Sequence, residues 1–175
     1  MALASPEEAF ARAEELGNSP VEYSSARVRG RVVITTTTNG TQALVAARHA
    51  ALVIVAAYRN RSAVVAALRE ALPRVSGVTL LAAGQAGEPA VENLCCARSI
   101  AWALSAGDAL RVGARIAPEP CEEVDLAQTP HAVALEAAGF GEDVRFALQR
   151  DVSPLVPTLV DGGLIARLST PVPGA

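Results

Sequence analysis

The stretch from Ile34 to Gln42 reads ITTTTNGTQ and brings hydroxyl groups, an amide and a glycine together. A protein core has little use for so many hydroxyl groups in a row. Backbone N–H groups at a helix start, with hydroxyls beside them and a glycine for close approach, form an anion site. This threonine loop is therefore a candidate phosphate or sulfonate site, and a plain helix cap with a turn is the alternative. Its candidate residues are Thr36, Thr37, Thr38, Asn39, Gly40 and Thr41.

Asn60 is the candidate in a second loop, Tyr58-Arg-Asn60, which also precedes a helical segment. Its amide is either a substrate ligand or an ordinary N-cap, and single caps are common. Arg59 and Arg61 lie on either side of it. An arginine there suits bidentate recognition of a phosphate, although solvent-exposed charge is the commoner role.

A third, Gly-rich loop contains Gly84 and Gly87 and leads to Glu92 at a helix start. Glu92 is a first-turn acid favoured by the helix dipole, or a Mg²⁺ ligand, or a general acid or base. Cys96, four residues on, is by default a buried structural cysteine. A thiolate nucleophile would need a positive partner, and Arg98 is the one nearest in sequence.

His131 follows Thr129-Pro130 and is either a surface residue of a first helical turn or a proton donor at a cleft. The other histidine, His49, ends an Ala-rich helical segment, where a positive charge is favourable. With only two histidines, far apart in sequence, a His-rich metal cluster is excluded.

Composition narrows the class of protein. The 15 basic residues are all Arg, so a Schiff-base lysine and the lysine of a P-loop are excluded. A net charge of −3 gives no basic footprint for nucleic acid. An odd count of three cysteines predicts reduced thiols in a cytoplasmic protein. The apolar stretches are shorter than the roughly 20 residues of a membrane span, and the start resembles no signal peptide.

The elements that must position these loops alternate between strands and helices. Strands are predicted at 31–37, 52–57 and 78–82, and helices at 41–50, 62–72 and 91–105. This order predicts an α/β fold with a mostly parallel sheet and flanking helices. Ligands bind outside the carboxyl ends of such strands, where the three loops fall.

One domain of 175 residues is predicted, in three portions. Residues 1–16 form an N-terminal helix capped by Ser5, and residues 17–110 form the βα core. Residues 111–170 form a C-terminal portion of two helices and a hairpin turning at Asp161-Gly-Gly163.

Several short stretches occur in an order that resembles the 2-phosphosulfolactate phosphatase family of coenzyme M biosynthesis. They are GNSP, TTTNGT, Asn60-x-x-Ala63, AG-x-x-G, Glu92 with Cys96-Ala97, and then His131, Gly139-Phe140, Asp143, Asp151 and Val156-Pro157. The likeness spans residues 17 to about 168. It implies a Mg²⁺-dependent phosphatase with an α/β fold that converts 2-phosphosulfolactate to 3-sulfolactate and phosphate.

The resemblance also implies roles for residues. Asn18 and Ser19 match the family's GNSP stretch and the threonine loop would bind phosphate or sulfonate. Glu92 and Cys96 match its catalytic element, and Glu92 is also the candidate metal ligand. The partner implied is a small phosphorylated sulfonate or carboxylate, with neither nucleic acid nor a membrane.

The chain departs from the family pattern in three places. Family members usually carry a further βαβ portion before GNSP, with acid and arginine groups that these residues lack. Asn93 stands where a second acid is usual, and Arg98 where a small residue is usual. The alternative expectation is therefore an impaired homologue that binds a small anion, or a structural relative that forms a homo-oligomer across an uncovered sheet.

Overall fold

The computed structural model describes residues 16–35, 37–105, 121 and 124–168. The predicted N-terminal helix, Thr36 of the threonine loop and the end of the chain lie outside these residues. The elements are, in order, η1 (Pro20–Glu22), α2 (Ser25–Val28), α3 (Gly40–Ala47), η2 (Tyr58–Asn60), α4 (Arg61–Ala71), η3 (Leu72–Arg74), α5 (Val91–Ser105), η4 (Leu126–Gln128), α6 (Pro130–Ala137), α7 (Gly141–Ala147), β1 (Leu155–Val160) and β2 (Gly163–Leu168).

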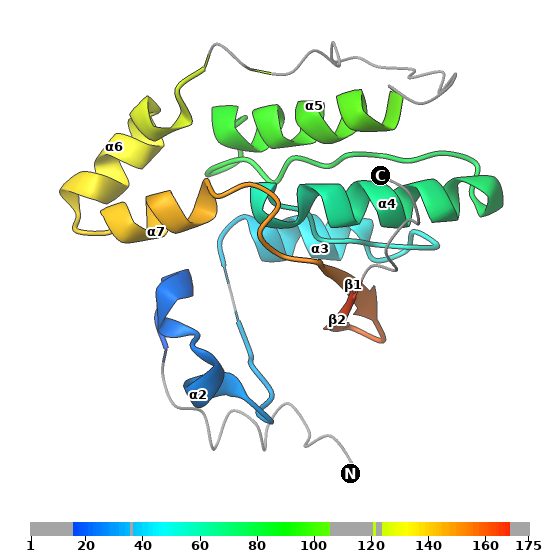
Figure 1. Cartoon of the computed structure of the whole chain (residues 1–175), viewed down its shortest axis with the longest axis horizontal. Helices are drawn as coiled ribbons and strands as arrows, with labels where there is room; N and C mark the ends of the chain where they lie inside the picture. Colours follow the sequence, from blue (N-terminus) through cyan, green and yellow to red (C-terminus); the bar gives the residue numbers. More distant parts are fainter. Residues whose placement is uncertain (1–15, 36, 106–120, 122–123, 169–175) are drawn as a thin grey trace.

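Helices α4 and α5 pack against one another and form the main core (Figure 1). Val64 and Leu68 lie one turn apart on α4, so they share the face that meets α5. Ile100 and Leu104 repeat the same spacing on α5 and are buried with them. Burying each of these side chains stabilises the fold by about 2 kcal/mol. The sequence predictions for both helices are confirmed within one residue at each end.

Helices α6 and α7 form a second pair, at one end of the molecule in Figure 1. Thr129 caps α6, because its Oγ1 accepts a hydrogen bond from the backbone N–H of Ala132 at 3.3 Å. Gly139 follows α6 with φ +91°, a conformation that favours glycine and ends the helix. Both helices were predicted from the sequence and are confirmed.

The predicted hairpin is confirmed as an antiparallel pair in which Val160 faces Gly163. Its two-residue loop has positive φ at both positions, +49° at Asp161 and +80° at Gly162. An Asp-Gly pair adopts this conformation readily, so the turn chemistry sets the register of β1 against β2.

The mostly parallel sheet is not confirmed among the described residues. Three predicted strands, which we call the apolar segments, run through 31–35, 52–57 and 78–82 and form no ladder with one another in the part of the chain described. Segment 52–57 pairs instead with β1 in antiparallel fashion, because the Val55 N–H donates to the Pro157 carbonyl at 2.8 Å. The fold therefore mixes helices with a small antiparallel sheet.

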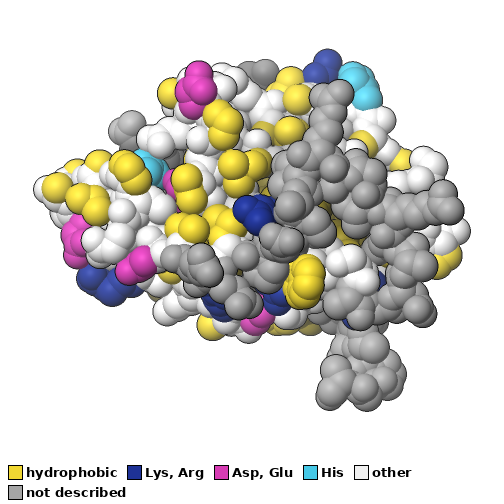
Figure 2. All heavy atoms as spheres, turned by 90° about the horizontal axis from the view of Figure 1, so that it is seen from above, with side chains coloured by type: hydrophobic (Ala, Val, Ile, Leu, Met, Phe, Trp, Pro, Cys, Tyr) yellow, Lys and Arg dark blue, Asp and Glu magenta, His cyan; other side chains and the backbone are white. Residues whose placement is uncertain are grey.

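The apolar segments leave large hydrophobic side chains in solvent. Val32 is 55% exposed and Leu81 is 56% exposed, and Ile34 and Leu52 are also exposed. Figure 2 shows hydrophobic side chains spread over the face seen from above. The apolar segments are therefore less buried than their composition predicts.

None of the helices in the described part of the chain is both long enough and apolar enough to cross a membrane.

Candidate functional site

The threonine loop closes the turn that starts α3. Thr37 Oγ1 accepts a hydrogen bond from the Thr41 N–H at 3.2 Å, and the Thr41 hydroxyl donates to the Thr37 carbonyl. A Cβ at Gly40 would lie 3.2 Å from Thr37 Oγ1, so the glycine lets the loop and the helix approach closely. Two of the threonines therefore act as caps, while the Thr38 side chain is exposed.

Asn39 connects the threonine loop to the Gly-rich loop. Its Oδ1 accepts a hydrogen bond from the Ala86 N–H at 3.0 Å, although the two residues are 47 positions apart. Asn39 makes no side-chain cap on α3, because its amide is turned toward the other loop. The structure thus brings together two of the loops that the sequence singled out.

The Gly-rich loop is a tight turn with an unusual backbone. Positive φ angles occur at Gly84, Ala86 and Gly87, at +71°, +52° and +85°. Backbone hydrogen bonds between Gln85 and Glu88 close the turn in both directions, at 2.8 and 2.9 Å. A Cβ on Gly84 would lie 2.5 Å from the Glu88 carbonyl oxygen, so only glycine fits there.

Two more segments join at this turn. Asn93, in the first turn of α5, accepts a hydrogen bond from the Gly84 N–H at 2.9 Å through Oδ1. His131, in the first turn of α6, has Nδ1 at 2.9 Å from Gln85 Nε2. We call these five residues, Asn39, Gln85, Ala86, Asn93 and His131, the loop junction. It places polar groups from four distant segments around one turn.

Asn60 has a different role from the one expected of a ligand or a cap. Its Oδ1 accepts from the Ala57 N–H at 2.8 Å, and its Nδ2 donates to the carbonyls of Val55 and Leu155 at 3.2 and 3.0 Å. The side chain is buried, and both of its donor hydrogens have backbone partners. It therefore ties segment 52–57 to β1.

The N-cap of α4 comes from far along the chain. Asp151 Oδ1 accepts from the Ser62 N–H at 2.6 Å, and Asp151 also lies 3.8 Å from Arg61. Arg61 Nη2 donates to the Ser99 carbonyl at 3.2 Å. Arg59 stacks on Phe146 with 3.6 Å to the ring centroid. Both arginines thus connect helices of the fold.

Asn18 and Ser19 lie beside η1, next to α7. The Ser19 hydroxyl is buried and donates to Asp143 Oδ1 at 2.7 Å, while the Asn18 side chain is exposed. The contacts described for these two residues do not reach the loop junction. Their substrate-binding role stays a prediction.

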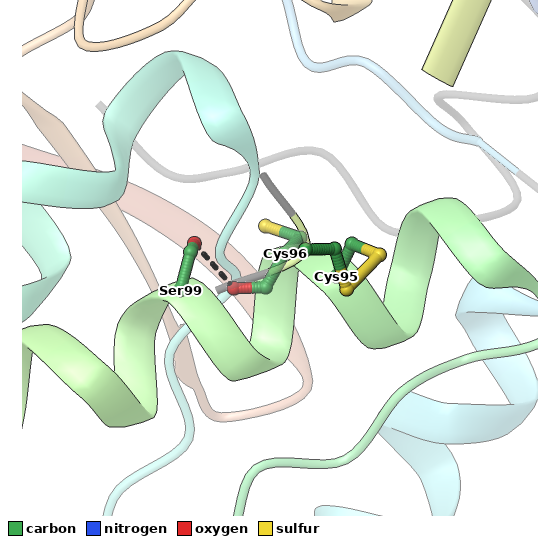
Figure 3. Close-up of a disulfide and its surroundings, with 4 residues drawn as sticks. Cys95, Cys96 and Ser99 are labelled. Atoms are coloured by element: carbon green, nitrogen blue, oxygen red, sulfur yellow. Dashed lines mark hydrogen bonds between the residues drawn. A yellow bond between two sulfur atoms is a disulfide. The ribbon is translucent and has the colours of Figure 1, made fainter. Parts of the chain in front are cut away.

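The cysteines correct a prediction. Cys95 and Cys121 form a disulfide, with their Cα atoms 5.3 Å apart, so the expectation of three reduced thiols is wrong for this pair. The reason is spatial, since Cys121 returns to the buried cluster of Tyr58, Cys95 and Leu126. Figure 3 shows the Cys96 sulfur pointing away from the disulfide on the same helix.

Cys96 is the free thiol in the described part of the chain, and it is half-buried. Burial raises the pKa of Cys96 to about 11, and the charges of Arg61 and Arg150 only partly oppose this. The thiol is therefore protonated at neutral pH, which suits packing or weak donation better than nucleophilic attack. Its assignment as catalytic stays a prediction.

Tyr58 lies close to Cys96 and Glu92. Burial raises the pKa of Tyr58 to about 12, helped by the negative charges of Cys96 and Glu92 and opposed by Arg150 and Arg61. The Arg150 guanidinium lies 5.2 Å from the Tyr58 ring centroid. Tyr58 and Arg150 also line a hollow of about 210 Å³ with residues of η4. Glu92 is close enough to this cluster to act on the Tyr58 pKa, and in the sequence it precedes the junction residue Asn93 in the first turn of α5.

A resident metal does not fit the described residues by themselves. Among them, no three His, Cys, Asp or Glu side chains gather closely enough to hold an ion. Glu92 remains a single candidate ligand.

Sequence reasoning missed Gln85, Asp143 and Asp151 as partners of site or loop residues. A glutamine between two glycines in a tight loop is a weak signal, because nothing local shows which side chain it meets. Asp143 and Asp151 are part of the family-like order of residues, but that order does not predict that Asp143 would meet Ser19 or that Asp151 would meet Ser62.

Comparison with known proteins gives a consistent picture. Residues 10–162 match the family described as 2-phosphosulpholactate phosphatase. A probable 2-phosphosulfolactate phosphatase of Thermotoga petrophila is 35% identical over 87% of this chain and 67% of its own length. Proteins with the same description from Deinococcus radiodurans and Thermus thermophilus are 40% and 37% identical, over 85% and 83% of this chain.

The chain spans about two thirds of the length of these relatives, 64% for the Deinococcus and Thermus proteins. The resemblance inferred from short stretches is confirmed, because the match covers most of the chain at more than 30% identity. The chain belongs to the 2-phosphosulpholactate phosphatase family, a family of phosphoric monoester hydrolases.

Proposed function

We propose that this chain hydrolyses the phosphate ester of 2-phosphosulfolactate to 3-sulfolactate and inorganic phosphate. The relatives are described as probable 2-phosphosulfolactate phosphatases, which supports the reaction class and the substrate. The observation that carries the proposal is the loop junction, where the Asn39 amide holds the Gly-rich loop against the start of α3.

The start of α3 suits the phosphate group. The N–H groups of a first helical turn carry partial positive charge, which favours a negatively charged group at this end of the helix. The exposed Thr38 hydroxyl adds a donor beside them. We assign the phosphate to this end of α3 and the sulfonate or carboxylate of the substrate to the neighbouring Gly-rich loop, with Gly84 and Gly87.

We assign Glu92 to proton transfer with water at this site. Glu92 is half-buried in the first turn of α5, one residue before the junction residue Asn93. A carboxylate so placed can accept a proton from a water molecule while the water oxygen attacks phosphorus and the ester oxygen departs. The protonated thiol of Cys96 fits a supporting position in this scheme.

Mg²⁺ dependence is a separate proposal. The reaction builds negative charge that a divalent ion can neutralise, and Glu92 is the candidate ligand. The described His, Cys, Asp and Glu side chains do not gather into a metal cluster, so further ligands would have to come from outside the described residues.

Phosphate release from 2-phosphosulfolactate tests the proposal, with Mg²⁺ and with EDTA. Glu92→Gln should lower kcat about 100-fold, as expected for loss of one acid–base group. Glu142→Gln, an exposed acid in the first turn of α7, is the matched control and should retain activity. If the wild-type protein releases no phosphate, the proposed hydrolysis is contradicted. If it releases phosphate in EDTA as well, only the proposed Mg²⁺ dependence is contradicted.

A second candidate is an impaired homologue that still binds a small anion and associates with another copy of itself. The exposed apolar segments favour the association with another copy. Their composition is typical of buried strands, yet Val32, Leu52 and Leu81 are exposed. We propose that these segments adopt the predicted parallel arrangement when their edges are covered. A role in coenzyme M biosynthesis and a cytoplasmic location stay predictions.

A further inference from the structure

His131 is held firmly in place at the start of α6. The preceding Thr129 is buried, its Oγ1 accepts from the Ala132 N–H at 3.3 Å, and its hydroxyl donates to the Leu126 carbonyl at 3.2 Å. Pro130 then fixes φ in the first helical position. The imidazole therefore projects from a backbone with little freedom, beside the Gly-rich loop.

Gln85 lies beside one ring nitrogen of His131, with its Nε2 at 2.9 Å from Nδ1. The roles of the two nitrogens in this contact depend on the tautomer of the ring. An amide nitrogen donates and does not accept, so a hydrogen bond in this orientation uses the tautomer in which Nδ1 bears no hydrogen. The neutral imidazole then carries its proton on Nε2 and presents a donor on the side of the ring away from Gln85.

The backbone of the Gly-rich loop fixes Gln85 in turn. Gln85 and Glu88 exchange two backbone hydrogen bonds, and the next residue, Ala86, donates to Asn39 Oδ1 at 3.0 Å. The same loop thus contacts both the histidine and the residue that precedes α3.

We propose that His131 is a further catalytic residue, a neutral hydrogen-bond donor through Nε2–H to the phosphoryl group, and that Gln85 is its positioning residue. This inference rests on the proposed function. The donor stabilises charge that develops on oxygen as the P–O bond breaks, and the imidazole keeps its proton throughout. Water supplies the new oxygen on phosphorus, and its proton ends on the sulfolactate hydroxyl.

The tautomer can be measured without activity. The chain has two histidines, so ¹⁵N-histidine NMR gives two ring systems, with His49 as the internal control and His131→Gln for assignment. We expect the Nε2–H tautomer for His131 and a mixture of tautomers in Gln85→Leu. Titration with inorganic phosphate should shift the His131 Nε2–H resonance and leave His49 unchanged. An Nδ1–H tautomer, or no phosphate-dependent shift at His131, would overturn the proposal.

Kinetics of the same variants separate a donor from a structural residue. His131→Ala should lower kcat/KM about 100-fold, as for loss of one oxyanion donor. His131→Gln places an amide N–H near the position of Nε2 and should recover at least tenfold of that loss. Equal loss in both variants, or unchanged kcat/KM in His131→Ala, argues against the donor role. If the wild-type protein is inactive but the His131 Nε2–H resonance still shifts with phosphate, the proposed hydrolysis is refuted. The contact between His131 and phosphate is then still supported.

Discussion

The surroundings of each polar side chain decide whether it serves structure or chemistry. Asn39 and Asn60 are both asparagines that precede helices. Asn60 is buried and donates both side-chain hydrogens to backbone carbonyls, so its role is to join segment 52–57 to β1. Asn39 is less buried and joins two loops, which leaves it next to the proposed anion site.

Replacing Asn60 by alanine should lower the free energy of unfolding by about 2 kcal/mol, because buried backbone groups lose their partners. The affected groups are the Ala57 N–H and the carbonyls of Val55 and Leu155. Urea denaturation measures the change, with the exposed Gln128→Ala as the control. A midpoint equal to that of the control would show that the three hydrogen bonds contribute little.

Cys96 should react slowly with iodoacetamide in the folded protein at neutral pH. Its pKa is raised from 9.0 to about 11 by burial, so little thiolate is present. Because the pKa is higher in the folded state, Cys96 favours folding fully below pH 9, where the thiol is neutral. This contribution to the free energy of unfolding is lost as the pH rises toward 11. Mass spectrometry of alkylated Cys96 against pH measures the titration. Fast alkylation at pH 7 would instead indicate an activated nucleophile.

At the scale of elements, the Gly-rich loop and the disulfide hold segments that lie far apart in sequence. The loop connects α3, α5 and α6 through side-chain hydrogen bonds. The disulfide joins α5 to Cys121, just before the segment that leads to η4 and α6. Both features therefore determine where His131 lies.

Gly84→Ala should disrupt the loop far more than Gly87→Ala. Both glycines have positive φ, but a Cβ at Gly84 would lie 2.5 Å from the Glu88 carbonyl, while nothing lies within 4 Å at Gly87. The shared backbone penalty is roughly 1 kcal/mol, so the difference between the variants reports the clash. Thermal unfolding gives both values, and equal destabilisation would contradict this loop geometry.

Reduction of the disulfide should destabilise the protein by about 3.5 kcal/mol in the chain-entropy account, for a loop of this length. The bridged residues are 26 positions apart. Thiol titration of the unfolded, unreduced protein should find one thiol, Cys96, and three after dithiothreitol. Three thiols before reduction would show that the bridge does not form. The variant Cys95→Ser is the matched check on stability.

Local patterns were sufficient to predict helices α4 to α7 and the hairpin, but not the short helix α2. Helix α5 begins and ends at the predicted residues, and Asp161-Gly162 sets the hairpin turn through backbone preference alone. The disulfide partner of Cys95 and the contact between Asn39 and Ala86 depend on residues 26 and 47 positions away. No periodicity carries that information. The mostly parallel sheet is not confirmed among the described residues for the same reason, because the composition of a strand does not determine which strand pairs with it.

At the scale of the whole molecule, the three apolar segments leave large hydrophobic side chains in solvent. Their valine and leucine side chains are exposed, although the composition of those segments is typical of buried strands. Unpaired strand segments favour pairing with another chain. We therefore propose that a second copy of the chain covers this surface.

Sedimentation velocity should therefore show self-association that increases with protein concentration. Val33→Asp and Leu81→Asp, both on apolar segments, should reduce it. Val133→Asp changes an equally exposed valine on α6 and should leave association unchanged. A monomer at all concentrations would contradict coverage by a second copy.

The most direct test of the central claim is the rate of phosphate release from 2-phosphosulfolactate by the wild-type protein and by Asn39→Asp. The aspartate keeps an oxygen acceptor for the Ala86 N–H but puts a negative charge beside the proposed phosphate position. We predict that the variant unfolds at the wild-type temperature and loses at least 100-fold in kcat/KM, as expected when an anion site becomes anionic. Wild-type activity in Asn39→Asp would contradict a phosphate site at the loop junction.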